Sequence, residues 1–415
     1  MRGIRKSVKM LTASLGVLCA LLFSGTAVLD SRLPDRYQVV EGQRLTIGAA
    51  GAVQAVYAGA REKDSAAMAK TSGENYAVEL RLFGLFPLKA ASVEVVDELY
   101  VQPSGEPFGV KIYTEGVIVV GFSEVDAAEG GVTPAREAGI LEGDNIKSIG
   151  GKAVTSNADI AARIEGCGGR PVSVELRRGD KALTLTLVPA FSESEGRYKA
   201  GVWVRDSSAG IGTLTFYSPS LGVAAGLGHG ICDVDTDKLL PLSTGEMVGA
   251  EIFGIDKSVS GSPGELRGRF TGKSLGNLLI NGETGIYGAV SANGDSGSLV
   301  RIAMKQEVQT GAAEILCTLD GETPKSYKCE IEKVHFNDDN LTQNMIVKVT
   351  DPDLLSKCGG IVQGMSGSPI LQGGKLIGAI THVFIGEPER GYAIFAETMY
   401  NTALSVEDAV KQSVS

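Results

Sequence analysis

The chain of 415 residues has little basic charge, little histidine and no close pairs of cysteines. It carries 49 acidic against 39 basic side chains, a formal net charge of −10. This charge repels phosphate backbones, which excludes nucleic acid as a partner. Beyond Cys19 the cysteines stand singly, without the spacing of metal ligands, so no metal site is expected. Their odd number leaves free thiols as the simplest state, although Cys317 and Cys329 flank an expected hairpin turn and could face one another.

The first residues differ in composition from the rest of the chain. Residues 1–9 contain four cations, and an uncharged, mostly apolar run follows from Met10 to Leu29. That run is long enough to cross a bilayer as a helix. The cations before it predict a cytoplasmic N-terminus, a transmembrane signal-anchor over 10–29 and an extracytoplasmic remainder. A cleavable signal peptide is the alternative, since small residues lie at 24–27.

The next two segments predict a small β module and a PDZ domain. Residues 30–105 contain stretches of alternating apolar and polar residues, which predict a membrane-proximal β-rich region. Residues 106–190 resemble a PDZ domain of bacterial proteases, through the run from Ala135 to Ile146 and the Gly-Gly turn at 150–151. That resemblance implies a loop whose backbone N–H groups bind the terminal carboxylate of a peptide. The loop residues would be Phe108, Gly109, Val110 and Lys111. A docking module with an empty groove is the alternative.

The remaining segment, 191–415, is rich in glycine and turn signals and lacks βα alternation, which predicts an antiparallel β-barrel. The fold class is therefore mainly β. Within it, Gly364-Met365-Ser366-Gly367-Ser368-Pro369 resembles the nucleophile turn of chymotrypsin-like serine peptidases. Register with that turn makes Ser366 the nucleophile, and the N–H groups of Gly364 and Ser366 the oxyanion hole. A strand, a turn, a strand and a closing helix follow, as at the end of a chymotrypsin-like chain.

A second serine motif lies upstream, at Gly294-Asp295-Ser296-Gly297-Ser298. It lacks the proline, the hairpin and the closing helix that follow Ser366. We interpret it as a hairpin turn with local Asp and Ser hydrogen bonds, and Ser296 stays as the alternative nucleophile.

A serine nucleophile needs a base, and the chain has three histidines. His335 lies in a polar stretch, and His382 follows a strand that looks buried. His229 lies among small residues in Gly226-Leu227-Gly228-His229-Gly230, where a tight turn can expose its side chain. The sequence favours His229 as the base. For the orienting acid, spacing does not choose among the carboxylates; Asp351 ends an apolar strand, and could equally be the N-cap of the segment that follows it.

The combination of anchor, β module, PDZ segment and these two motifs resembles the stage IV sporulation protein B (SpoIVB) peptidase family. The resemblance implies a triad of His229, Asp351 and Ser366, with Thr381 helping to position the acid, and it implies no cofactor. It further implies a self-cleaving signalling peptidase, secreted between the forespore and mother-cell membranes. Its protein substrate would be a membrane-bound regulatory subunit of the complex that restrains sigma-K precursor processing. A catalytically inactive PDZ adaptor and a general envelope quality-control protease are the alternative functions.

Overall fold

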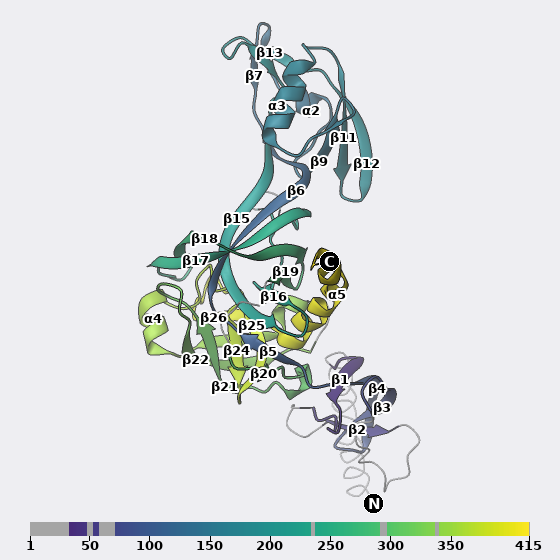
Figure 1. Cartoon of the computed structure of the whole chain (residues 1–415), viewed down its shortest axis with the longest axis vertical. Coiled ribbons are helices and arrows are strands. Elements are labelled where there is room, and N and C mark those ends of the chain that lie inside the picture. Colours follow the sequence, from purple (N-terminus) through teal and green to yellow (C-terminus); the bar gives the residue numbers. More distant parts are fainter. Residues whose placement is uncertain are drawn as a thin grey trace, which may run out of the picture.

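The computed structural model describes residues 33–47, 53–57, 71–233, 237–290, 297–336 and 340–414. The molecule is elongated and predominantly β, with a small sheet at one end, a PDZ-like region at the other and the barrels between them (Figure 1). The expected cytoplasmic N-terminus and signal-anchor, residues 1–29, lie outside the described residues. Within the described ranges, no helix combines the length and the apolar character needed to cross a membrane.

The sheet at the N-terminal end has the strand order β1-β4-β3-β2. Its strands are β1 (Arg36–Val40), β2 (Val53–Tyr57), β3 (Asn75–Leu82) and β4 (Phe86–Val96). Apolar residues at alternate positions, such as Val78 and Leu80 on β3 and Val93 and Val95 on β4, point to one face and are buried there. This face holds the module together.

The PDZ-like region contains one longer helix and one hairpin. The helix is α3 (Asn157–Gly166), which begins with a capping box between Ser156 and Asp159. The hairpin is the pair β11 (Val172–Arg178) and β12 (Lys181–Leu187). Its smaller elements are β7 (Val125–Ala127), β8 (Gly130–Val132), α2 (Pro134–Glu137), β9 (Asn145–Ile149), β10 (Lys152–Ala153), β13 (Ala190–Ser192) and β14 (Arg197–Lys199).

Two long strands join this region to the first barrel. β6 (Pro107–Phe122) and β15 (Val202–Ser218) pair antiparallel from Thr213↔Pro107 to Val202↔Phe122. At one end the ribbon belongs to the PDZ-like region, and at the other it closes a six-stranded ring in the order β6-β17-β18-β19-β16-β15 (Figure 1). The other four strands are β16 (Val223–Gly226), β17 (Leu242–Asp256), β18 (Glu265–Gly282) and β19 (Gly285–Val290).

This topology corrects two predictions. Residues Phe108, Gly109, Val110 and Lys111 do not form a carboxylate-binding loop. They lie inside β6 with β15 on one side and β17 on the other, and Phe108 is fully buried. Their backbone groups are therefore already paired within the sheet. The domain boundaries move as well, because the first barrel begins at β6 and the PDZ-like region is an insertion between two of its strands.

The second barrel is closed in the order β21-β22-β23-β26-β25-β24. Its strands are β21 (Gly311–Cys317), β22 (Lys325–Val334), β23 (Met345–Val349), β24 (Pro369–Gln372), β25 (Lys375–Val383) and β26 (Arg390–Phe395). Between β23 and β24 lies the short helix α4 (Pro352–Cys358). Register places Cys329 opposite Ala313 and Cys317 opposite Lys325, so the two thiols do not face each other, and both are free and buried.

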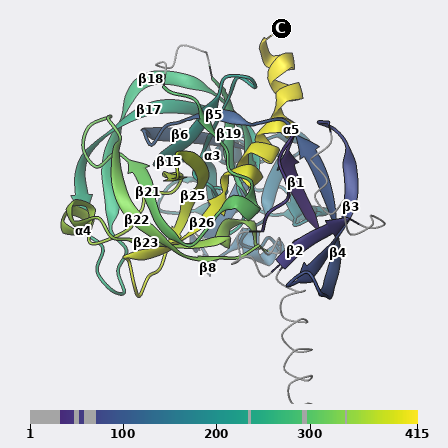
Figure 2. The same cartoon turned by 90° about the horizontal axis from the view of Figure 1, so that it is seen from below.

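The chain closes with α5 (Ala396–Val414), the helix expected at 397–412. Met399 and Ala403 on α5 pack against the barrel core. Figure 2 shows α5 between the barrels and the N-terminal sheet, where Asn401 donates to the side chain of Gln38 at 3.4 Å. The short elements β5 (Tyr100–Pro103), β20 (Val300–Arg301), the 3-10 turn η1 (Lys305–Glu307) and the 3-10 turn η2 (Leu341–Gln343) complete the described fold.

Candidate active site

The turn that carries Ser366 is fixed against the first barrel by β15. Thr213 donates its N–H to the carbonyl of Ser366 at 3.0 Å and its hydroxyl to the carbonyl of Gly364 at 2.8 Å. The Thr215 hydroxyl donates to the carbonyl of Gly367 at 2.8 Å. Gly367 has φ +94°, and a Cβ there would lie 2.0 Å from the Thr213 carbonyl oxygen, so only glycine fits. The nucleophile turn of the second barrel is thus anchored to a strand of the first.

The two serines of the turn lie in different environments. Ser366 is half-buried, and its hydroxyl donates to the backbone carbonyl of Thr381 at 2.7 Å. Ser368 is fully buried, and its Oγ has no hydrogen-bond partner among the described residues. A nucleophile must reach a substrate carbonyl, which Ser368 cannot do from this position. Ser366 is the accessible hydroxyl of the pair.

The backbone around Ser366 leaves two N–H groups available. Among the described residues, the N–H groups of Gly364 and Ser366 donate to no other group, while those of Met365, Gly367 and Ser368 are all bonded. Gly364 has φ +93°, a conformation that strongly favours glycine. Free donors on either side of a turn are the arrangement that stabilises a developing oxyanion.

His229 lies just after β16, in a tight turn at the end of a first-barrel strand. Leu227, two residues before it, has φ +65°, an unusual conformation for leucine. The Nδ1 of His229 lies 2.8 Å from the carbonyl oxygen of Gly230. A carbonyl can only accept, so Nδ1 carries the hydrogen and Nε2 keeps its lone pair. Burial lowers the pKa of His229 below its ordinary value of 6.5, although the bond to Gly230 raises it in part.

The His229 and Ser366 turns pack directly on each other. A Cβ at Gly367 would lie 2.5 Å from the backbone nitrogen of Leu227, and Leu227 donates its N–H to the Thr213 carbonyl. A Cβ at Gly228 would lie 3.1 Å from Cγ2 of Thr381, whose carbonyl accepts the Ser366 hydroxyl. Both turns therefore meet at the junction of the barrels, beside residues 381–382. In the structure as it stands, the Ser366 hydroxyl points to Thr381 and not to the imidazole.

His382 is a third member of this cluster that the motifs did not single out. Its ring centroid lies 4.8 Å from that of His229, with an angle of 32° between the rings. Although part of the His382 side chain is exposed, the surrounding protein and then the charge of His229 lower its pKa to about 4. His382 directly follows Thr381, whose carbonyl accepts the Ser366 hydroxyl. In the sequence, this adjacency is the feature that could have indicated a place for His382 in the site.

Asp351 and Thr381 make contacts other than those implied by the triad. Asp351 caps α4: its carboxylate accepts the N–H groups of Asp353 and Leu354, and also that of Lys328. Burial raises the pKa of Asp351, and these backbone hydrogen bonds outweigh it and hold the pKa below the usual range. In the described part of the chain its carboxylate forms no hydrogen bond with His229. The Thr381 hydroxyl donates to the carbonyl of Thr342 at 2.7 Å rather than to a carboxylate.

The remaining candidates do not join the cluster. Ser296, the alternative nucleophile, lies outside the described residues. His335 is exposed after β22, and its N–H donates to the Asn344 carbonyl at 2.6 Å. Within the described ranges no group of three or more His, Cys, Asp or Glu side chains could hold a metal ion.

Two family models match parts of the chain. The model of the SpoIVB peptidase S55 family matches residues 196–400, and a PDZ domain model matches residues 131–178. The chain belongs to the SpoIVB peptidase S55 family. The prediction of a serine endopeptidase is confirmed at the level of this family, as is the PDZ domain. The family match covers both His229 and Ser366, which lie 137 residues apart in the sequence.

Individual relatives match only short stretches. The chain is 36% identical over 70 residues to a protein of Clostridium perfringens described as a zinc metalloprotease, which is 17% of this chain and 21% of that protein. It is 44% identical over 57 residues to serine protease HTRA1 of Xenopus tropicalis, 14% of this chain and 12% of that protein. The chain thus spans about a fifth or less of either relative. Among solved structures, the Rv3671c protease of M. tuberculosis matches 48% of this chain and 74% of its own at 14% identity, with a TM-score of 0.30.

Proposed function

We propose that the chain is a serine endopeptidase in which Ser366 is the nucleophile and His229 the general base. One observation carries the proposal: the two turns come from different barrels and are fixed against each other by Thr213, which bonds the Ser366 turn and accepts the N–H of Leu227. Residues brought from separate parts of the chain to one junction form the set that acyl transfer needs: an Nε2 that keeps its lone pair, and two N–H donors without a partner among the described residues.

The chemistry follows from the protonation of the cluster. When a substrate binds, the Ser366 hydroxyl turns from the Thr381 carbonyl to His229, and Nε2 takes its proton as Oγ attacks the peptide carbonyl. The N–H groups of Gly364 and Ser366 bind the oxyanion of the tetrahedral intermediate. Protonated His229 then gives its proton to the leaving amine, and the acyl group stays on Ser366. Water, activated by the same imidazole, hydrolyses the ester and restores both residues.

The Gly230 carbonyl performs part of what an acid does in a triad. It holds the tautomer of His229 that leaves Nε2 basic, and it fixes the plane of the ring. It does not supply the full negative charge that stabilises the imidazolium formed during attack. The family resemblance implies Asp351 as the acid, but its contacts with the backbone N–H groups of Asp353, Leu354 and Lys328 support the role of helix cap, which we propose instead.

We also propose the biological setting that the family implies. A signal-anchor over residues 10–29 would hold the chain at a membrane, with the bulk in the space between the forespore and mother-cell membranes. There the peptidase would cleave itself and a membrane-bound regulatory subunit of the sigma-K processing complex, while the PDZ domain directs it to its target. The apolar run, its flanking cations and the family match support this proposal.

The test is the full-length chain with Ser366→Ala, compared with wild type for fragments produced on incubation at several protein concentrations. We expect the fragments to disappear, because removal of a serine nucleophile leaves at most about one part in 10⁴ of the rate. Ser368→Ala is the matched control and should cleave as wild type does. Unchanged fragments in Ser366→Ala would favour the inactive PDZ adaptor. Extensive digestion of unfolded proteins at many sites would instead indicate a general quality-control protease.

A further inference from the structure

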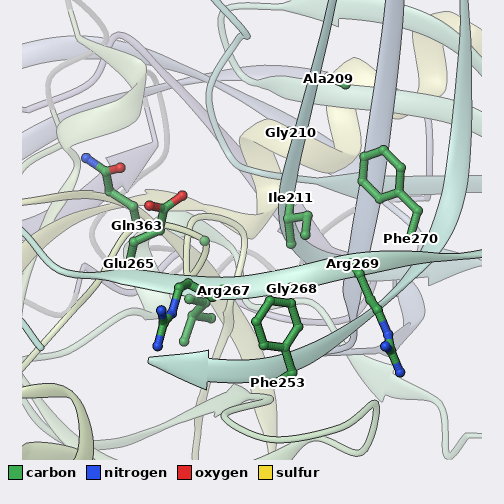
Figure 3. Close-up of a pocket in the computed structure, with 12 residues that line it drawn as sticks. Ala209, Gly210, Ile211, Phe253, Glu265, Arg267, Gly268, Arg269, Phe270 and Gln363 are labelled. Atoms are coloured by element: carbon green, nitrogen blue, oxygen red, sulfur yellow. The ribbon is translucent and has the colours of Figure 1, made fainter. Parts of the chain in front are cut away.

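A cavity of about 610 Å³ lies beside the nucleophile turn (Figure 3). Residues 209–211 of β15 and 265–270 of β18 form its walls, and Gln363 and Gly364 complete it on the side of the second barrel. Its volume falls within the range of about 300–1,000 Å³ that is usual for ligand sites. Because Gly364 lines it, the cavity adjoins the N–H group that we assign to the oxyanion hole.

The cavity is apolar at its centre. The rings of Phe253 and Phe270 and the side chain of Ile211 face it (Figure 3), and Leu266 underlies Gly364, since a Cβ on that glycine would lie 3.1 Å from Cβ of Leu266. Phe253 is 60% exposed and Phe270 is 37% exposed, which is a large apolar area to leave in water. Such rings gain free energy when another apolar group covers them.

The charges at the rim are largely compensated within the chain. Arg267 forms an ion pair with Asp256 at 3.5 Å, and Arg269 forms one with Glu251 at 2.5 Å. Both guanidiniums therefore have an acidic partner within the chain, whereas Glu265 and Gln363 also line the cavity. The cavity offers a ligand the apolar area between two aromatic rings, together with one carboxylate and one amide.

We propose that this cavity is a substrate subsite that takes a large apolar side chain, leucine, methionine or phenylalanine, close to the bond that is cut. The occupant is the substrate polypeptide, because Gly364 belongs both to the cavity wall and to the nucleophile turn. This inference rests on the proposed function and adds a preference to it. The peptide sequence on one side of the cut, and not only access to the bond, then decides which bonds are cleaved.

Two variants test the subsite in opposite ways. Ala209 is exposed, lines the cavity and lies two residues before Ile211 on the same face of β15, so Ala209→Phe adds a ring on the cavity side. The double substitution of Phe253→Ala and Phe270→Ala removes its aromatic walls from partly exposed positions. Phe86→Ala, on β4 of the N-terminal sheet and 47% exposed, is the control for loss of an exposed ring.

The probe is a mixture of short synthetic peptides of varied sequence, incubated with the full-length protein, whose cut sites are mapped by mass spectrometry. In wild type we expect large apolar residues to be enriched at one fixed position near the cut. Both cavity variants should lower kcat/KM at those cuts about tenfold or more and abolish the enrichment, while Phe86→Ala keeps it. Unchanged preference and rate in either folded variant would overturn the subsite.

A fluorophosphonate that reacts with activated serines separates this outcome from failure of the proposed function. If wild type is not labelled at Ser366, the proposed function is wrong. If Ser366 is labelled normally in wild type and in the double alanine variant, yet the cleavage preference of that variant is unaltered, the subsite alone is wrong. Normal labelling with lost preference supports both.

Discussion

The two barrels contribute to the same site, but they differ in how their strands are ordered along the chain. The second barrel uses six strands between residues 311 and 395, each joined to the next by a short connection or by α4. The first barrel takes β6 from before the PDZ-like region and the other five strands from after it. The second barrel is thus a local structure, whereas the first closes only when β15 returns to β6. The proposed catalysis depends on both, because β15 of the first barrel fixes the Ser366 turn of the second.

The largest effect should come from the first barrel's contribution to the chemistry. We expect His229→Ala to lower kcat/KM by about 10⁶, since Nε2 of His229 would no longer accept the Ser366 proton. The measurement is the rate of fragment formation from a defined peptide substrate. His335→Ala, which removes an exposed histidine just after β22, should retain the wild-type rate. Equal losses in both variants would remove His229 as the base.

A second prediction concerns the closure of the first barrel. Phe108 is fully buried between β15 and β17, so Phe108→Ala should lower the free energy of unfolding by about 3–5 kcal/mol. Urea unfolding followed by intrinsic fluorescence measures the change. Phe86→Ala is the surface control, with an expected effect within about 0.5 kcal/mol. If Phe108→Ala leaves the stability unchanged but weakens the binding of peptide termini, the result would favour the carboxylate-binding loop that the sequence predicts and contradict the buried strand.

The third prediction concerns Asp351 in the second barrel, where a substitution distinguishes a structural role from a catalytic one. As the N-cap of α4, Asp351→Ala should lower the stability by about 0.5–2 kcal/mol and leave kcat/KM within a few-fold of wild type. The lowered pKa of Asp351 adds stability that is present above its unfolded value, near 4, and is lost as pH falls through the lower folded pKa. The variant should therefore lose less stability than wild type over that acid range. A fall in kcat/KM of about 10⁴ would instead make Asp351 the orienting acid of a triad.

The smallest effect concerns the pH dependence at the barrel junction. Burial lowers the pKa of His229 below its ordinary value of 6.5, so the fall of kcat/KM with decreasing pH should be centred below pH 6.5. A fall of kcat/KM centred above pH 6.5 would contradict the burial of the His229 imidazole. His382→Gln keeps a polar side chain beside His229 without a second titrating ring, and should alter the rate by less than about tenfold.

The same difference between the barrels explains how much could be predicted from the sequence. The Ser366 turn, the strands after it and α5 follow one another along the chain, so a local pattern was sufficient to predict them. The nature of β6 was not predictable, because Phe108 to Lys111 has a glycine and apolar residues that suit a PDZ loop as well as a buried strand. Only the return of β15, about ninety residues later, decides between them.

The candidate site divides in the same way. Ser366 and His229 each lie in a glycine-rich turn, and such turns are visible in sequence. His382 was not singled out, because its role depends on a ring contact across the junction and not on a motif. The role of Asp351 depends on α4, because capping this helix and orienting the imidazole would both use the same carboxylate. The spacing of residues in the sequence does not distinguish these two roles.

The most direct test of the account is the site of reaction with a fluorophosphonate, mapped by peptide mass spectrometry in the full-length protein. The junction of the barrels predicts a single adduct on Ser366, lost in His229→Ala and retained in Ser368→Ala and Asp351→Ala. An adduct on Ser296 or Ser368, or labelling of Ser366 that does not depend on His229, would contradict a Ser366–His229 site built across the two barrels.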